Sequence, residues 1–189
     1  MAQAIISGVK DAGLDASIIV GEPFEARRES LKSDLGVEVT ASNREAIAGA
    51  DIVVLSVKPQ QLEAVAEELD GALNADQTVL SIMAGVKIHS IGLKLNHTKL
   101  IRVMPNTPAQ IRKGISAWTA SDDVEQATLD FVASMLSAIG DELKFSDEKN
   151  IDIATALSGS GPGYVFVFIE ALTDAGVELG LPVHVARHL

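Results

Sequence analysis

The fold of this chain is decided by the stretch Asp51-Ile52-Val53-Val54-Leu55-Ser56-Val57-Lys58-Pro59. Positions 52–55 are all apolar, with no alternation of polar and apolar residues. That pattern is typical of a parallel strand that is buried on both faces. Pro59 suits the first turn of a helix, and the helical pattern continues to about Leu69. A buried strand that leads directly into a helix is the repeating unit of an α/β protein.

The same alternation extends outward on both sides of this stretch. It predicts helices at 1–12, 24–35, 43–48, 59–69, 88–95 and 124–138, and strands at 17–20, 37–39, 51–57, 78–82, 99–104, 115–119 and 143–145. Strands and helices that alternate at this spacing indicate a parallel sheet covered by helices on both faces. We therefore expect a doubly wound α/β fold.

After residue 147 the sequence no longer alternates between strand and helix patterns, and only helices are predicted. Helices are predicted at 151–157 and 164–179, joined by Ser158–Pro162, and Pro182 opens another. The second helix begins with apolar residues nearly all round, so it needs partners to bury it. We expect a first domain over residues 1–148 that lacks its first strand, and over 149–189 the start of an all-α domain. That domain is expected to form a homodimer or higher homo-oligomer through the stripe of Phe166, Phe168 and Ile169.

Composition excludes several classes of function. The net charge is −11, which disfavours nucleic acid and anionic lipid as partners. The chain has no cysteine, so disulfides and thiolate metal sites are excluded. His184 and His188 have the spacing of a metal pair but lack a third ligand, and we assign no metal. No apolar run reaches the roughly 18 residues of a membrane span, and a cytoplasmic enzyme is expected.

Ligands of open α/β sheets bind at the loops that leave the carboxyl ends of the strands. Four such loops here combine small residues and prolines with few charges, which suits close approach of the backbone to a flat ligand. They are 21–23, 56–59, 83–85 and 104–108. The glycine-rich turn that usually joins the first strand to the first helix is not in the chain. We expect that residues are missing before Met1, because the fold would otherwise begin with a helix.

Several motifs resemble the pyrroline-5-carboxylate reductase family along essentially the whole chain. Arg102–Pro108 matches the Arg-x-Met-Pro-Asn-Thr-Pro motif of that family in full, and Leu157–Pro182 matches its long Leu-Ser-Gly-Ser-Gly-Pro motif and the residues that follow. Gly163 stands where alanine is commoner. The shorter matches are Met1-Ala2 at the end of a glycine loop, Asn43, Val57-Lys58-Pro59 and Ala84-Gly85-Val86.

The resemblance implies a Rossmann-like fold and the reduction of 1-pyrroline-5-carboxylate to L-proline with NADPH or NADH, without a metal. It implies contacts with the cofactor from the residues Met1, Ala2, Glu22, Arg27, Asn43, Ser56, Val57, Lys58, Pro59, Ala84, Gly85, Met104, Pro105 and Asn106. Asn106, Thr107 and Ser160 are candidates near the site of hydride transfer. The family's substrate-carboxylate loop is expected beyond Leu189, so the chain as written is expected to have little or no turnover.

Alternatives remain for the protein and for single residues. It could be another Rossmann reductase of the β-hydroxyacid dehydrogenase type, or a non-catalytic fragment. Glu22 would favour NADH, and Arg27 or Arg28 would favour NADPH, which is the cofactor we expect. Arg28 is better explained by solvent exposure. Either Asn43 or its neighbour Ser42 could simply cap a helix.

Other side chains are expected to have ordinary structural roles. Lys58 could be a solvated charge and Asn106 a turn residue. His89 and His97 are expected to face solvent. Trp118 and Tyr164 are expected to pack rather than to stack on a ligand.

Overall fold

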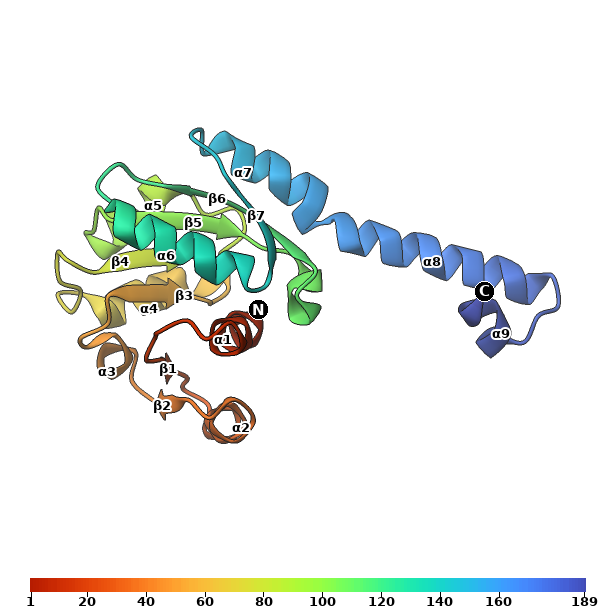
Figure 1. Ribbon diagram of the computed structural model, residues 1–189, viewed down its shortest axis with the longest axis horizontal. Coiled ribbons are helices and arrows are strands. Elements are labelled where there is room, and N and C mark those ends of the chain that lie inside the picture. The colour runs from red at the N-terminus through yellow and green to blue at the C-terminus, as the bar shows by residue number, and fades with distance from the viewer.

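The computed structural model describes all 189 residues and divides the strands between two sheets (Figure 1). The larger sheet has the order β3-β4-β5-β6-β7, and the smaller one pairs β1 with β2. Their bounds are β1 Ile19–Gly21, β2 Glu38–Thr40, β3 Ile52–Leu55, β4 Thr78–Ser81, β5 Leu100–Met104, β6 Gly114–Ala120 and β7 Gly140–Lys144. The predicted strands are confirmed to within a few residues.

The larger sheet is not parallel throughout, and that expectation was wrong for its last strands. Strands β3, β4 and β5 are parallel, β6 runs antiparallel to β5, and β7 is parallel to β6. The only element between β5 and β6 is the short 3-10 helix η2, Thr107–Ile111. A connection this short cannot return the chain to the other end of the sheet, as a parallel neighbour would require.

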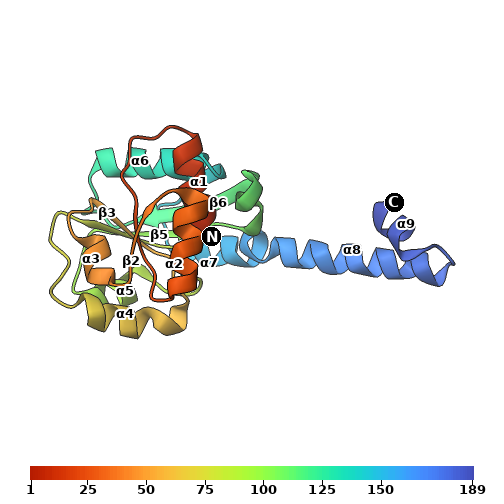
Figure 2. The ribbon, with the colours of Figure 1, turned by 90° about the horizontal axis from the view of Figure 1, so that it is seen from below.

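Helices cover both faces of the larger sheet (Figure 2). Helices α1 (Ala2–Asp11) and α6 (Gln126–Ser137) share one apolar core with the sheet, and α3 (Asn43–Ile47), α4 (Leu62–Leu69) and α5 (Ile88–Leu95) share a second core on the opposite face. Helix α2 (Glu25–Leu35) packs beside β2 and α1. The predicted doubly wound α/β arrangement is confirmed.

An apolar cavity of about 690 Å³ lies between the two sheets. Residues of β1 and β3 line it together with side chains of α1, α3 and α6. Neither strand has a partner on the side toward the cavity, since β1 pairs only with β2 and β3 only with β4. Ile19 and Val54, in the middle of this fold, are 41% and 37% exposed for the same reason. No backbone hydrogen bonds therefore join β1 to the larger sheet.

The chain leaves the sheet after β7 as an almost continuous rod of helix. Helix α7 (Lys149–Ala154) passes through a π-helical segment, η3 (Thr155–Gly159), into the long helix α8 (Gly161–Glu178), and α9 (Val183–His188) folds back on its end. The predicted joint at Ser158–Pro162 is thus helical rather than a loop, apart from a single turn residue, Ser160. Helix α8 projects away from the sheet, and Phe166 on it is 65% exposed (Figure 1). None of the helices is both long and apolar enough to cross a membrane.

Asp147 marks the turn where this rod begins. Its carboxylate accepts a hydrogen bond from the Lys149 backbone N–H at 3.0 Å and lies 3.1 Å from the Lys149 ammonium. The hydrogen bond from the Lys149 backbone, followed by the one from the Lys149 side chain, holds the pKa of Asp147 below its usual value. The carboxylate therefore stays ionised at neutral pH and fixes the first turn of α7.

Three of the structural roles expected for single side chains can be judged directly. Trp118 is buried, as expected, whereas Tyr164 is 63% exposed on α8. The expectation for His97 was wrong: it is buried, and its Nε2 lies 2.7 Å from the Gln77 backbone oxygen. His97 is buried because its ring contacts the backbone of the loop before β4. The residues around position 97 do not predict this contact.

Replacing Gly140 with alanine is expected to destabilise the chain by about 2–4 kcal/mol, because a backbone conformation unfavourable for alanine and a steric clash both contribute. Gly140 opens β7 with a φ of +142°, and a Cβ there would lie 2.1 Å from the Gly114 backbone oxygen on β6. Urea unfolding of Gly140→Ala would measure the loss. Gly163→Ala, on the open surface of α8, is the control and should be neutral or slightly stabilising. Equal midpoints for Gly140→Ala and the parent would contradict this account.

Candidate active site at the carboxyl edge of the sheet

Glu22 directly follows β1, and Arg27 and Arg28, on the first turn of α2, lie close to it. The Glu22 carboxylate accepts from the Phe24 backbone N–H at 3.1 Å, and Arg27 Nε lies 3.9 Å from its other oxygen. Arg28 donates to the backbone oxygens of Glu22 and Pro23, both at 2.8 Å. The expectation that Arg28 faces solvent was wrong, because these carbonyls hold it half-buried. Of the two arginines, Arg27 is the one whose guanidinium is accessible to a ligand.

Asn43 lies beside the end of β1 and does not cap its helix. The cap of α3 is Ser42, whose hydroxyl oxygen accepts from the Glu45 backbone N–H at 3.3 Å. The Asn43 amide instead donates to Glu68 at 2.6 Å, and its oxygen is so close to Gly21 that a Cβ on Gly21 would lie 2.6 Å away. Of the two capping alternatives, Ser42 is therefore the one that applies, and Asn43 stands at the edge of the candidate site.

The loops after β3 and β4 present small and exposed groups. Ser56 and Lys58 are exposed, and the Lys58 side chain makes no hydrogen bond or ion pair. Pro59 opens a 3-10 turn, η1 (Pro59–Gln61), which leads into α4. After β4, Ala84 and Gly85 are exposed, and Gly85 adopts a φ of +73° with no atom near its missing side chain. Both loops leave the backbone open to a ligand.

The loop after β5 meets the π-helical segment that follows α7. The Asn106 side chain accepts from the Ile115 backbone N–H at 2.9 Å and donates to the Ser158 backbone oxygen at 3.2 Å. A Cβ on Gly159 would lie 2.9 Å from the Met104 methyl carbon. Asn106 is thus a bridge between two parts of the chain rather than an ordinary turn residue. The structure brings together two motifs that lie about 50 residues apart.

The candidate hydroxyl groups differ in their freedom. Ser160 donates to the Thr155 backbone oxygen at 3.0 Å, so its proton is engaged within the helix. Thr107 is exposed, and its hydroxyl makes no hydrogen bond within the chain. Met1 and Ala2 begin α1, which packs against η2, so they lie on the same edge as Thr107. Sequence reasoning missed Glu68 as the partner that orients Asn43, since nothing in the local pattern links residues 25 positions apart.

The chain is similar to known proteins over its entire length. A family model described as NADP oxidoreductase coenzyme F420-dependent matches residues 1–85, and one described as pyrroline-5-carboxylate reductase dimerisation matches residues 148–189. The pyrroline-5-carboxylate reductase of Pseudomonas aeruginosa is 41% identical over all of this chain and 70% of its own length. This chain belongs to the pyrroline-5-carboxylate reductase family.

Solved structures agree with this membership. The pyrroline-5-carboxylate reductase of Streptococcus pyogenes superposes with a TM-score of 0.88 at 31% identity, over 100% of this chain and 70% of that one. The pyrroline carboxylate reductase of Plasmodium falciparum with NADP bound superposes with a TM-score of 0.85 at 28% identity. The match covers 98% of this chain and 69% of that one. A reductive aminase from Aspergillus terreus, at 14% identity and 0.74, shares the fold alone.

Proposed function

We propose that this reductase-family chain contributes to the reduction of 1-pyrroline-5-carboxylate to L-proline with NAD(P)H, the last step of proline biosynthesis. The observation that carries the proposal is the meeting of the Met104–Thr107 loop with Ser158–Gly159 at the carboxyl edge of the sheet. Both segments belong to the family's long motifs. Residues 1–148 would hold the cofactor, residues 149–189 would form the dimer, and the cytoplasm is the proposed location.

The residues at this edge fit a nicotinamide cofactor. Bound NAD(P)H supplies a hydride to the C=N carbon of the substrate, and a proton at the nitrogen completes L-proline. Asn43 and the loop Ser56–Pro59 would contact the adenosine and phosphate side, where the free Lys58 ammonium suits a phosphate. Ala84, Gly85 and the Met104–Thr107 loop would line the nicotinamide. Met1 and Ala2 would contact the phosphates from the start of α1, where backbone N–H groups are unpaired.

Thr107 is the hydroxyl best placed to meet the substrate. Its side chain is exposed and unpaired, whereas the Ser160 proton is held by a backbone oxygen. Asn106 positions the loop that carries Thr107, because its amide is already engaged on both sides. We assign Thr107 to orient the substrate beside the nicotinamide, and Ser160 to shape the opposite wall.

A direct assay tests the proposal. The chain is mixed with NADPH and 1-pyrroline-5-carboxylate, and NADPH consumption and L-proline are followed together. We expect proline to form slowly, below about 0.1 s⁻¹ against a typical enzyme rate of about 10 s⁻¹. The reason is that no backbone hydrogen bonds hold β1, and with it the nearby Glu22 and Arg27, in register with β3 and its loop. Ready turnover would contradict the expected low rate, and an absence of proline would contradict the function.

A preference for NADPH over NADH is proposed from Arg27 on α2, whose guanidinium is accessible beside Glu22. Arg27→Ala is expected to raise the Kd for NADPH about 10-fold, the loss of one charge-assisted contact, and to leave the Kd for NADH nearly unchanged. Fluorescence titration with each cofactor measures both constants. Lys32→Ala, an exposed charge on α2, is the matched control. Equal losses for the two cofactors would overturn the preference.

A homodimer is proposed through α8. Its exposed apolar residues include Tyr164, Val165, Phe166, Val167, Phe168, Ile169 and Leu172. An apolar helix surface of this extent is far more stable when it packs against a second helix than in water. The match of residues 148–189 to a dimerisation family supports a second copy of the chain as the partner.

A further inference from the structure

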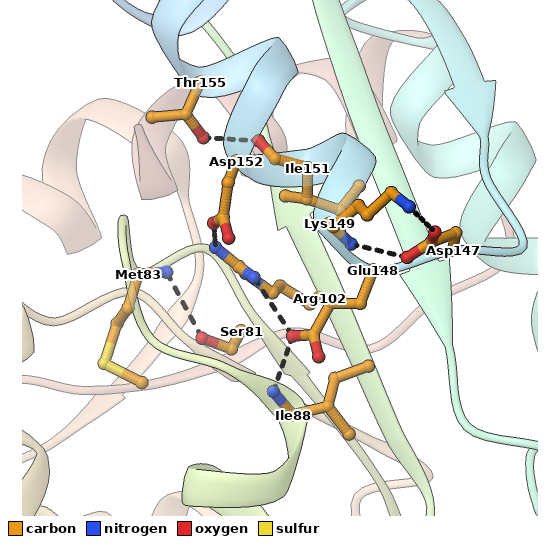
Figure 3. A network of polar contacts seen from close by, with 10 residues as sticks. All are labelled: Ser81, Met83, Ile88, Arg102, Asp147, Glu148, Lys149, Ile151, Asp152 and Thr155. Atoms are coloured by element: carbon orange, nitrogen blue, oxygen red, sulfur yellow. Dashed lines mark hydrogen bonds and ion pairs between the residues drawn. The ribbon is translucent and has the colours of Figure 1, made fainter.

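Arg102 on β5 is a charged side chain buried inside the sheet region. Its side chain is 1% exposed, and a guanidinium at such depth is costly unless it is paired. Figure 3 shows its two partners: Nη1 lies 3.0 Å from Glu148 and Nη2 lies 2.6 Å from Asp152. Both carboxylates belong to the start of α7, so the pairs join the strand to the helical rod.

The geometry of these pairs fixes α7 in rotation as well as in position. Glu148 and Asp152 are four residues apart, so they lie on one face of the helix one turn apart. Glu148 also accepts the Ile88 backbone N–H at 2.8 Å, at the start of α5 (Figure 3). Ile151, next to Asp152, is fully buried. The first turn of α7 is therefore held by β5 and α5 at once.

These contacts contribute less to stability than their number suggests. Arg102 Nε is buried without any hydrogen-bond partner, which is an unpaid desolvation cost. A buried charge network of this kind often contributes little net stability compared with apolar packing, but it can select one arrangement of the parts. Arginine suits that task, since its rigid planar guanidinium presents a separate nitrogen to each carboxylate, whereas lysine offers one ammonium on a flexible stem.

The segment positioned in this way is the one that meets the candidate hydride-transfer site. Two residues after Arg102 on the same strand, Met104 contacts Gly159, and Asn106 donates to the Ser158 backbone oxygen. Helix α7, which carries Asp152, continues directly into the π-helical segment η3, which contains Ser158 and Gly159. A rotation of α7 would therefore displace Ser158–Ser160 from the loop after β5.

We propose that Arg102 is a positioning residue: through Glu148 and Asp152 it sets the rotation of α7, and so places Ser158–Ser160 against the Met104–Thr107 loop. The consequence for hydride transfer rests on the proposed function. The placement of the helix does not, and it can be measured without turnover.

Spin labels test the placement. The chain has no cysteine, so Ser90→Cys on α5 and Asp174→Cys on α8, both exposed, give one clean labelled pair. Double electron–electron resonance, with labelled chain diluted in unlabelled chain, reports the distance within one molecule. We expect one narrow peak for the parent, loss of that peak for Arg102→Met, and partial loss for Arg102→Lys. Lys99→Met, which removes the pair with Glu125, is the matched control and should keep the peak.

Activity supplies the second readout. Under single turnover, Arg102→Met is expected to slow hydride transfer about 100-fold, the scale of a misplaced site, with the Kd for NADPH unchanged. If Arg102→Met does not fold, Asp152→Ala leaves Arg102 paired with Glu148 and should broaden the peak. An unchanged distance peak in the folded variants overturns the proposal whatever the rates are. A broadened peak without any turnover in the parent upholds the placement and refutes the proposed function instead.

Discussion

Replacing both Phe166 and Ile169 with aspartate is expected to convert a dimer of this chain into monomers. The two residues lie three apart on one face of α8 and are 65% and 48% exposed. Two carboxylates on that face would have to be desolvated in the interface, so the dimer Kd should rise at least about 100-fold. Light scattering at matched concentrations measures the mass, and circular dichroism checks that the helices remain.

The control for this change is Leu93→Asp. Leu93 is 71% exposed on α5, so it offers the same change of chemistry on another surface. That variant should keep the mass of the parent. A double variant on α8 that also keeps it would place the dimer interface elsewhere, and a monomeric parent would refute the dimer itself.

Asn106→Ala is expected to slow hydride transfer about 100-fold under single turnover, because the site would lose its alignment. The change removes the acceptor of the Ile115 backbone N–H and the donor to the Ser158 backbone oxygen. Asn106→Asp keeps an acceptor for the Ile115 backbone N–H. It loses the donor to the Ser158 backbone oxygen and places a carboxylate oxygen against that carbonyl instead. It should therefore retain stability but not rate. Rapid-mixing absorbance of NADPH gives the rate.

Gln110→Ala is the matched control for Asn106. Gln110 is exposed on η2, the short helix that Asn106 directly precedes, and its side chain makes no hydrogen bond. It should leave the rate unchanged. If Asn106→Ala transferred hydride as fast as the parent, the contact with Ser158 would have no part in assembling the site.

Most of the α/β framework could be predicted because its signals are local. The apolar runs at Ile52–Leu55 and Thr78–Ser81 are confirmed as strands. Gly36 follows the predicted helix 24–35 and ends α2 in the left-handed conformation that glycine favours. Periodicity and helix-ending residues depend only on neighbouring positions, so they can be recognised without knowledge of the rest of the chain.

The features that escaped prediction depend on distant contacts. The direction of β6 depends on the shortness of η2, not on the apolar pattern of the strand. The Gly/Ser cluster at Ser158–Pro162 resembles a turn, yet it is helical and packs against Met104. Nothing in the residues around Arg102 indicates its ion pairs, because its partners lie 46 and 50 residues further along. Local patterns therefore indicated where the strands end and loops begin, but not the contacts that bring the Met104–Thr107 loop and Ser158–Gly159 together.

The transfer of deuterium tests the central claim most directly. The chain is incubated with 1-pyrroline-5-carboxylate and NADPH that carries deuterium at the transferred position of C4, and the product is analysed by mass spectrometry. The account predicts L-proline with one deuterium on the carbon that was the C=N carbon, formed slowly but above the level of the boiled chain. Proline without deuterium, or no proline above that level, would contradict it.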